Sequence, residues 1–161
     1  MEPRLDEVTL VEPIVNYSVR SLCRKPYPGH PKGCPNWDRR PTCPPQAQLL
    51  PVILDMRNPI YCIYNAFDLS SHIAKMQAKH PGWTDRQIRC CLYWQSKGRK
   101  QLRAKINAFL SNHPVLTVLY TPEAFGVDVD ATMLSIGMRL EWPPASLAYQ
   151  VALVGTAKKK V

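Results

Sequence analysis

The stretch IYCIYNAF at residues 60–67 is rich in β-branched and aromatic side chains, and its apolar positions alternate along the chain. A short run of this kind predicts a strand that is buried in a sheet. Other apolar runs before and after it predict further strands. These are expected at residues 11–17, 115–120, 138–140 and 147–154.

Three helices are predicted between these strands, at residues 68–79, 84–111 and 128–137. In the longest of them apolar residues return at helical intervals, and Gly98 near its middle predicts a kink or a close contact. Each helix starts with side chains that can accept hydrogen bonds from the free amides of the first turn. The capping candidates are Asp68 or Ser70, Thr84 together with Gln87, and Asp128 or Asp130.

The composition is that of one globular domain. The chain has 161 residues, of which 45% are hydrophobic and 20% are charged, and a chain of this kind can bury a core without cross-links. With the order of its elements, this predicts an α/β fold in which residues 1–161 form a single domain. We expect a mixed β-sheet packed with about three helices and a long loop rich in cysteine and proline, with residues 1–10 and 156–161 flexible.

No segment of the sequence is typical of export or of membrane insertion. No apolar run approaches the roughly 20 residues of a membrane span. The first residues, MEPRLDE, lack the basic start and apolar core of a secretory signal. We therefore expect a cytoplasmic protein that does not enter a membrane. In that compartment cysteines stay reduced and are available to bind metal or to react, rather than to form disulfides.

Half of the six cysteines lie in LCRKPYPGHPKGCPNWDRRPTCPP, residues 22–45. Cys23, Cys34 and Cys43 have the spacing C-x10-C-x8-C in this segment, whose prolines exclude regular structure. A loop of this length inside a compact domain is rare unless something specific orders it. A metal held by the three thiolates would order it, because binding energy then contributes to folding.

Three thiolates leave two kinds of metal site open. A [4Fe-4S] cluster held by three cysteines keeps one iron free to bind a substrate or sulfide. Zinc needs a fourth ligand, for which His30 is the nearest candidate, and the closed site would be structural. A third interpretation is that the cysteines are reduced thiols of a surface loop without metal, in a protein that acts as an adaptor.

Three segments carry a resemblance to a known family: CPNWDRRPTCPP at 34–45, PEAFGVDVDATMLSIGMRLEWPP at 122–144 and LAYQVALVG at 147–155. In these segments the chain resembles a prokaryotic family of cysteine-rich predicted metal-binding proteins of unknown function. The resemblance implies that Cys34, Cys43 and Cys23 are metal ligands. Phe125 stands where such proteins often have a cysteine, and the middle of the chain lacks their additional C-x2-C pair, so we expect one three-cysteine site.

The other three cysteines call for separate interpretations. Cys62 lies among the apolar residues of a predicted strand, and we expect a buried core thiol. Cys90 and Cys91 are neighbours on a predicted helix, where adjacent side chains point about 100° apart, so we do not expect them to share a metal. Cys90 lies beside the basic face of that helix and is the candidate reactive thiol, because positive charge lowers a thiol's pKa.

Positive charge gathers on the predicted helix at residues 84–111. The chain has 21 Lys and Arg against 12 Asp and Glu, a formal net charge of +9. A basic stripe with an aromatic residue suits a phosphate backbone, so a nucleic acid or another polyanion is an expected partner. The alternative is a solvated helix face. The stripe residues are Arg86, Arg89, Tyr93, Lys97, Lys100 and Arg103.

Acidic residues in the turn at 122–130 have two interpretations. Glu123, Asp128 and Asp130 can cap helices, or one of them can act as an acid or base if the fold brings this turn to the cysteine loop. No motif of a known catalytic type stands in the sequence, which leaves open whether the protein is an enzyme.

The favoured function is a metal-binding protein that holds one iron–sulfur cluster and acts in sulfur or redox chemistry on an anionic or nucleic-acid-linked substrate. The alternative function is a structural zinc module that presents the basic helix to an acidic partner.

Overall fold

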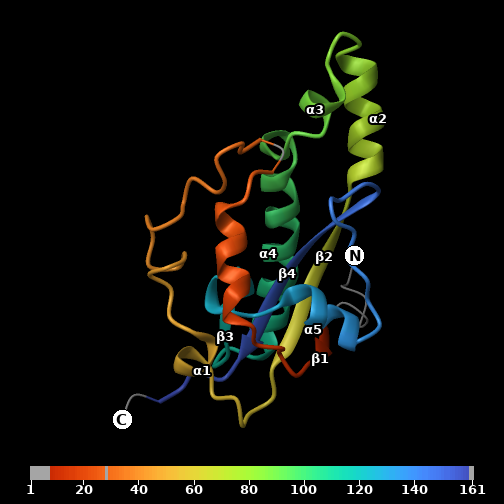
Figure 1. The fold of residues 1–161 in the computed structure, drawn as a ribbon. Helices are drawn as coiled ribbons and strands as arrows, with labels where there is room; N and C mark the ends of the chain where they lie inside the picture. Colours follow the sequence, from red (N-terminus) through yellow and green to blue (C-terminus); the bar gives the residue numbers. More distant parts are fainter. Residues whose placement is uncertain (1–7, 28, 160–161) are drawn as a thin grey trace.

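Two long strands, β2 (Tyr61–Asp68) and β4 (Leu147–Gly155), lie side by side at the centre of the fold (Figure 1). The computed structural model describes residues 8–27 and 29–159. β1 (Val8–Leu10) pairs with β2, and β3 (Thr117–Leu119) pairs with β4, which makes the strand order β1-β2-β4-β3. The predicted α/β class is confirmed.

The described chain has short 3-10 helices as well as α-helices. They are the 3-10 helices η2 (Tyr17–Arg24), η3 (Cys91–Tyr93) and η4 (Pro122–Phe125), and the α-helices α1 (Leu50–Ile53), α2 (Leu69–Lys79), α3 (Asp85–Ile88), α4 (Gln95–Asn112) and α5 (Val129–Ser135).

All three strand pairs are antiparallel, whereas the sequence predicted a mixed sheet. β2 and β3 run in the same direction and are joined by the helices α2, α3 and α4, the connection that a parallel pair requires. However, β4 lies between these two strands and pairs antiparallel with each of them. The final strand of the chain therefore decides the type of sheet.

Two of the predicted strands do not form. Within residues 11–17, Pro13 offers no amide hydrogen to a ladder, and the chain enters η2. Residues 138–140 follow α5, where the amide of Met138 donates to the carbonyl of Met133 (2.9 Å). This bond belongs to a helix-ending Schellman motif with Gly137 in the left-handed conformation (φ 84°), so that Met138 is used by the helix end and not by a strand.

The sheet is buried on both faces. Successive residues of a strand point to opposite sides, and Ile63 packs with Leu102 and Ile106 of α4 in a core on one side. Cys62 lies in the core on the other side, which α1, η4 and α5 cover. Figure 1 shows α4 and α5 on either side of the central strands.

The predicted helix caps are confirmed. Asp68 Oδ1 accepts a hydrogen bond of 3.0 Å from a first-turn amide of α2, and Asp128 Oδ1 does the same for α5 (3.0 Å). Thr84 and Gln87 form the capping box of α3, with hydrogen bonds of 2.8 and 3.2 Å between each side chain and the other residue's amide. These caps involve residues three apart, so the local sequence is enough to place them.

The long helix predicted at residues 84–111 is broken near its start, because α3 ends and the chain is extended at Cys90 (φ −57°, ψ 125°). Trp94 accounts for the break. Its buried ring stacks on Phe67 with centroids 5.5 Å apart, and its Nε1 donates to the carbonyl of Arg89 (3.1 Å). Burial of Trp94 against the end of β2 therefore overrides the helical periodicity.

α4 approaches β4 closely at Gly98. A Cβ on this residue would lie 2.7 Å from Cδ of Gln150. The same Gln150 accepts a hydrogen bond of 2.9 Å at Oε1 from Asn65 of β2. The close contact expected at Gly98 is confirmed. Because Gly98 has no side chain, the hydrogen bond between Asn65 and Gln150 fits beneath the helix.

Both described ends of the chain make backbone hydrogen bonds to the fold, where the sequence suggested flexibility. Residues 8–10 form β1 at the edge of the sheet. Near the other end, the amide of Lys158 donates to the carbonyl of Ile53 (2.8 Å). The remainder of both predicted tails, residues 1–7 and 160–161, lies outside the described chain.

Replacing Ile106 tests the packing of α4 on the sheet. Ile106 is 0% exposed, so Ile106→Ala removes buried methyl groups and should lower the free energy of unfolding by about 2–5 kcal/mol. Val115 is 86% exposed, so the control Val115→Ala should change the free energy of unfolding by less than about 0.5 kcal/mol. Urea denaturation followed by circular dichroism measures both. Equal losses in the two variants would contradict the packing described above.

Candidate functional site

The three predicted ligands Cys23, Cys34 and Cys43 are half-buried and lie in one region of the fold. Cys23 belongs to the last turn of η2, and the amide of Cys34 donates to its carbonyl oxygen (2.7 Å). Gly33 permits this closure, because its φ is +86° and a Cβ there would lie 2.8 Å from the carbonyl oxygen of Arg24. The loop is thereby closed at the end of η2.

Arg20 of η2 holds the returning part of this loop. Its guanidinium donates to the carbonyls of Pro45 (2.7 Å) and Ala47 (2.9 Å), and the amide of Ala47 donates to the carbonyl of Cys43 (2.9 Å). Within the described chain, Nε of Arg20 is buried and has no hydrogen-bond partner. An unpaired buried cationic donor favours an anionic acceptor at this place.

Cys23 interacts electrostatically with both of the other loop thiols. Burial raises the pKa of the Cys23 thiol most strongly, and negative charge on Cys34, Glu123 and Cys43 raises this pKa further, whereas the Arg20 guanidinium lowers it. We call Cys23, Cys34 and Cys43 the loop thiol cluster. Because its thiolates repel one another, a bound cation would stabilise them.

Glu123 of η4 also belongs to this region. Burial raises the pKa of its carboxyl, its own backbone amide lowers that pKa, and the charge of Asp130 raises it. η4 reaches the loop because it packs against η2 next to Gly126, where a Cβ would lie 2.5 Å from Cδ1 of Tyr17. The turn at 122–130 thus lies beside the cysteine loop. This proximity is the condition under which one of its acidic residues could act as an acid or base.

His30, the candidate fourth ligand of zinc, packs against Tyr27. The amide of His30 donates to the carbonyl of Tyr27 (2.8 Å), and the two rings meet edge to face with centroids 5.0 Å apart. Within residues 8–27 and 29–159, no three His, Cys, Asp or Glu side chains converge closely enough to hold one metal ion. Metal binding by the loop thiol cluster would therefore require cysteine side chains to turn about χ1 toward one another.

Cys90 and Cys91 lie against the same loop, at the break between α3 and α4. A Cβ on Gly29 would lie 2.9 Å from Sγ of Cys91 and 3.1 Å from Sγ of Cys90, so both sulfur atoms face one point. The expectation that the two side chains diverge around a helix is wrong, because the backbone is extended at Cys90. We call Cys90 and Cys91 the vicinal thiol pair.

Tyr27 lies near members of both the loop thiol cluster and the vicinal thiol pair. Burial, followed by negative charge on Cys34 and Cys91, raises the pKa of the Tyr27 hydroxyl, whereas Arg99 lowers it. Cysteines from two separate parts of the sequence therefore border one tyrosine, an arrangement for which the sequence offered no signal.

The predicted basic stripe does not lie on one helix. Arg86 and Arg89 belong to α3 and its end, and Arg89 forms an ion pair with Asp85 (2.9 Å). The remaining members lie after the break. They are Tyr93 in η3 and Lys97, Lys100 and Arg103 in α4.

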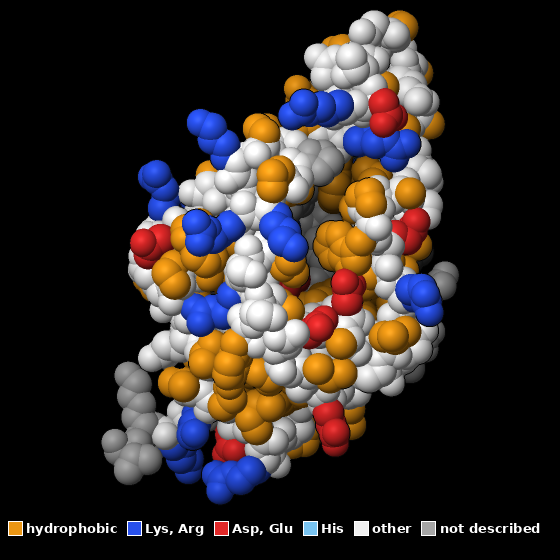
Figure 2. Space-filling model, in the orientation of Figure 1, with side chains coloured by type: hydrophobic (Ala, Val, Ile, Leu, Met, Phe, Trp, Pro, Cys, Tyr) orange, Lys and Arg blue, Asp and Glu red, His pale blue; other side chains and the backbone are white. Residues whose placement is uncertain are grey.

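Basic side chains are also dispersed over the surface. Arg103 lies over the ring of Tyr120, 5.4 Å from its centroid, and Tyr93 packs against Trp83 with centroids 5.1 Å apart. Figure 2 shows Lys and Arg side chains spread among apolar ones on the face it displays, without one continuous patch. Nucleic-acid binding stays a prediction. As for membranes, no helix in the described ranges combines the length and the apolarity that crossing a bilayer demands.

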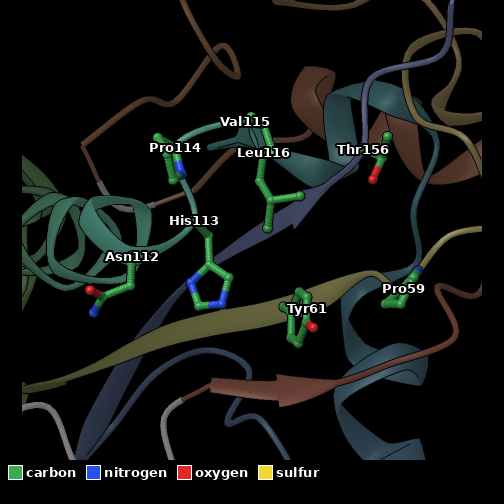
Figure 3. Close-up of a pocket in the computed structure, with 8 residues that line it drawn as sticks. All are labelled: Pro59, Tyr61, Asn112, His113, Pro114, Val115, Leu116 and Thr156. Carbon is green, nitrogen blue, oxygen red and sulfur yellow. The ribbon is translucent and has the colours of Figure 1, made fainter.

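A pocket of about 270 Å³ lies at the far end of α4 (Figure 3). His113 points from the end of that helix toward Tyr61 of β2, and the His113 ring stacks on Phe109 with centroids 4.2 Å apart. α4 has 18 residues and so spans about 27 Å, which separates this pocket from the vicinal thiol pair before the helix begins. None of the described residues that line the pocket is a predicted ligand.

Comparison of the chain with protein-family models, with curated proteins and with solved structures gave no match. The resemblance to a family of cysteine-rich metal-binding proteins stays a prediction.

Gly33 should be essential for the closure of the cysteine loop. Gly33→Ala puts a methyl group against the backbone of Arg24, and we expect it to lower the free energy of unfolding by about 1–2 kcal/mol more than Gly137→Ala. The control is matched, because Gly137 also has a positive φ (+84°) but would meet no atom within 4 Å. Urea denaturation of both variants measures the difference, and equal effects would contradict the closure.

Cys62 should make stability depend on pH. It is 0% exposed, and burial raises its pKa to about 12, which confirms a buried core thiol. In the unfolded chain this thiol ionises near pH 8.5, so its stabilising contribution is complete below that pH and is lost as the pH rises toward 12.

We therefore expect the free energy of unfolding of the native protein to fall more steeply above about pH 9 than that of Cys62→Ala, by up to about 1.4 kcal/mol per pH unit. Urea titrations at about pH 8, 9 and 10 measure the two slopes. Parallel slopes would show that Cys62 ionises equally well in the folded protein.

Proposed function

We propose that the protein is a metal-binding protein whose loop thiol cluster holds one iron–sulfur cluster of the [4Fe-4S] type. The observation that carries this proposal is the electrostatic interaction of three half-buried thiols that come from separate turns of one loop. Cysteine thiolates are the ligands that such clusters take. Cys23, Cys34 and Cys43 would be those ligands.

The surroundings of the loop thiol cluster suit an anionic, sulfur-rich group. Arg20 presents a buried Nε–H that lacks a partner among the described residues, and a sulfide or thiolate sulfur would accept its hydrogen bond. Rotation about χ1 moves a cysteine sulfur without moving the backbone. Convergence of the thiols by such rotations would leave the bond between the Cys34 amide and the Cys23 carbonyl in place.

Chemistry at this place would involve Glu123 as well. A [4Fe-4S] cluster with three cysteine ligands supplies one iron that is open to a substrate or to sulfide. The Glu123 carboxyl interacts with Cys23, and burial raises its pKa, so this residue can hold a proton in the same region. An acid beside the thiols favours sulfur or redox chemistry over a purely structural role. The net charge of +9 favours an anionic or nucleic-acid-linked substrate.

Anaerobic reconstitution with ferrous iron and sulfide tests the proposal. We expect about four iron and four sulfide per chain and an absorbance band near 400 nm, as is typical of such clusters. Serine at Cys23, Cys34 or Cys43 should abolish the band. Cys62→Ala should keep it, because Cys62 lies in the core on the sheet.

Two other results of the metal analysis would contradict the proposal. Stoichiometric zinc in a colourless protein, released by His30→Ala, would replace the proposal with the structural zinc site. Native protein that takes up neither metal would overturn the proposal altogether.

A further inference from the structure

The vicinal thiol pair is not used by the proposed cluster. Sγ of Cys91 and Sγ of Cys90 lie 2.9 and 3.1 Å from the position that a Cβ of Gly29 would occupy. In a regular helix, successive side chains point about 100° apart and do not meet at one point. Here the backbone at Cys90 is not helical (φ −57°, ψ 125°), and both sulfurs face Gly29. Rotation about χ1 would bring both sulfurs to one ion.

We propose that Cys90 and Cys91 form a second metal site, which binds one soft monovalent cation of the Cu(I) class. Thiolate sulfur selects such cations, whereas Mg²⁺ and Ca²⁺ take oxygen ligands and structural zinc takes four ligands. On binding, both thiols release their protons to solvent, and each sulfur donates one electron pair to the ion. The ion keeps its charge, and no oxidant or reductant takes part.

The surroundings of the pair fit a small ion. Gly29 has a φ of +98° and places no side chain in front of the sulfurs. Cys91 is buried and Cys90 is half-buried, so that access is from the side of Cys90. Burial and the charge of Cys90 raise the pKa of the Cys91 thiol, but Arg99 lowers it. The Arg99 guanidinium would therefore offset the net negative charge of a bis-thiolate complex.

This site is separate from the loop thiol cluster. Tyr27 borders both groups, because negative charge on Cys34 and on Cys91 raises the pKa of its hydroxyl. Across residues 8–27 and 29–159, no third His, Cys, Asp or Glu joins Cys90 and Cys91 closely enough to form a three-ligand site. A two-coordinate ion thus fits better than zinc, and the proposal does not depend on iron–sulfur binding.

Titration with Cu(I) tests the proposal. The full-length chain carries serine at Cys23, Cys34 and Cys43, and Cu(I) is added without oxygen in competition with bicinchoninate. We expect one Cu(I) per chain. Adding Cys90→Ser or Cys91→Ser to this background should weaken binding by at least about a hundredfold, because one of two ligands is lost.

Glycine variants test whether the fold around Cys90 and Cys91 contributes to Cu(I) binding, or whether the two thiols bind the ion without it. Gly29→Ala places a methyl group at the sulfurs and should weaken Cu(I) binding by about tenfold or more. The matched control Gly137→Ala, with a positive φ and no neighbour within 4 Å, should leave binding unchanged. Circular dichroism verifies folding of each variant, and Cys90→Ser alone decides the test if the buried Cys91→Ser does not fold.

Retained affinity in Cys90→Ser, or equal affinity in Gly29→Ala and Gly137→Ala, would overturn the second metal site. Failure of the native protein to load iron and sulfide, with Cu(I) binding intact, would overturn only the proposed function of the loop thiol cluster.

Discussion

The antiparallel pairing of β2 with β4 is the constraint on which the rest of the structure depends. It runs from Tyr61 opposite Val154 to Asp68 opposite Leu147 and joins the middle of the chain to its end. Because side chains alternate along each strand, a shift by one residue would exchange the two core faces. The register therefore determines that α4 covers one face and that α1, η4 and α5 cover the other.

The cysteine loop takes its place from the second of these faces. η4 packs there, and η2 packs on η4, so that Cys23 comes beside Glu123 although the two are far apart in the chain. Proline-rich sequence alone would leave the loop open. Gly33 closes it because only a residue without a Cβ can approach the backbone at Arg24, and Arg20 holds its return through two carbonyls. The loop thiol cluster is thus placed by backbone contacts.

A conflict between local and long-range preferences shapes the vicinal thiol pair. The sequence around Cys90 has helical periodicity, but burial of Trp94 against Phe67 interrupts the helix and turns two neighbouring sulfurs toward Gly29. Tyr27 borders members of both this pair and the loop thiol cluster. Sites of chemical interest commonly coincide with such departures from local preference.

Local sequence is enough to predict the features that depend on neighbours a few residues apart: the strand β2, the caps at Asp68 and Thr84, and the buried thiol of Cys62. The spacing of the loop cysteines identified candidate ligands but not their neighbours. The antiparallel sheet, the break in the long helix and the positions of Arg20, Glu123 and Tyr27 beside the thiols are set by tertiary packing. These outcomes depend on burial between segments far apart in the chain, and local patterns of charge and hydrophobicity do not encode which distant surfaces will meet.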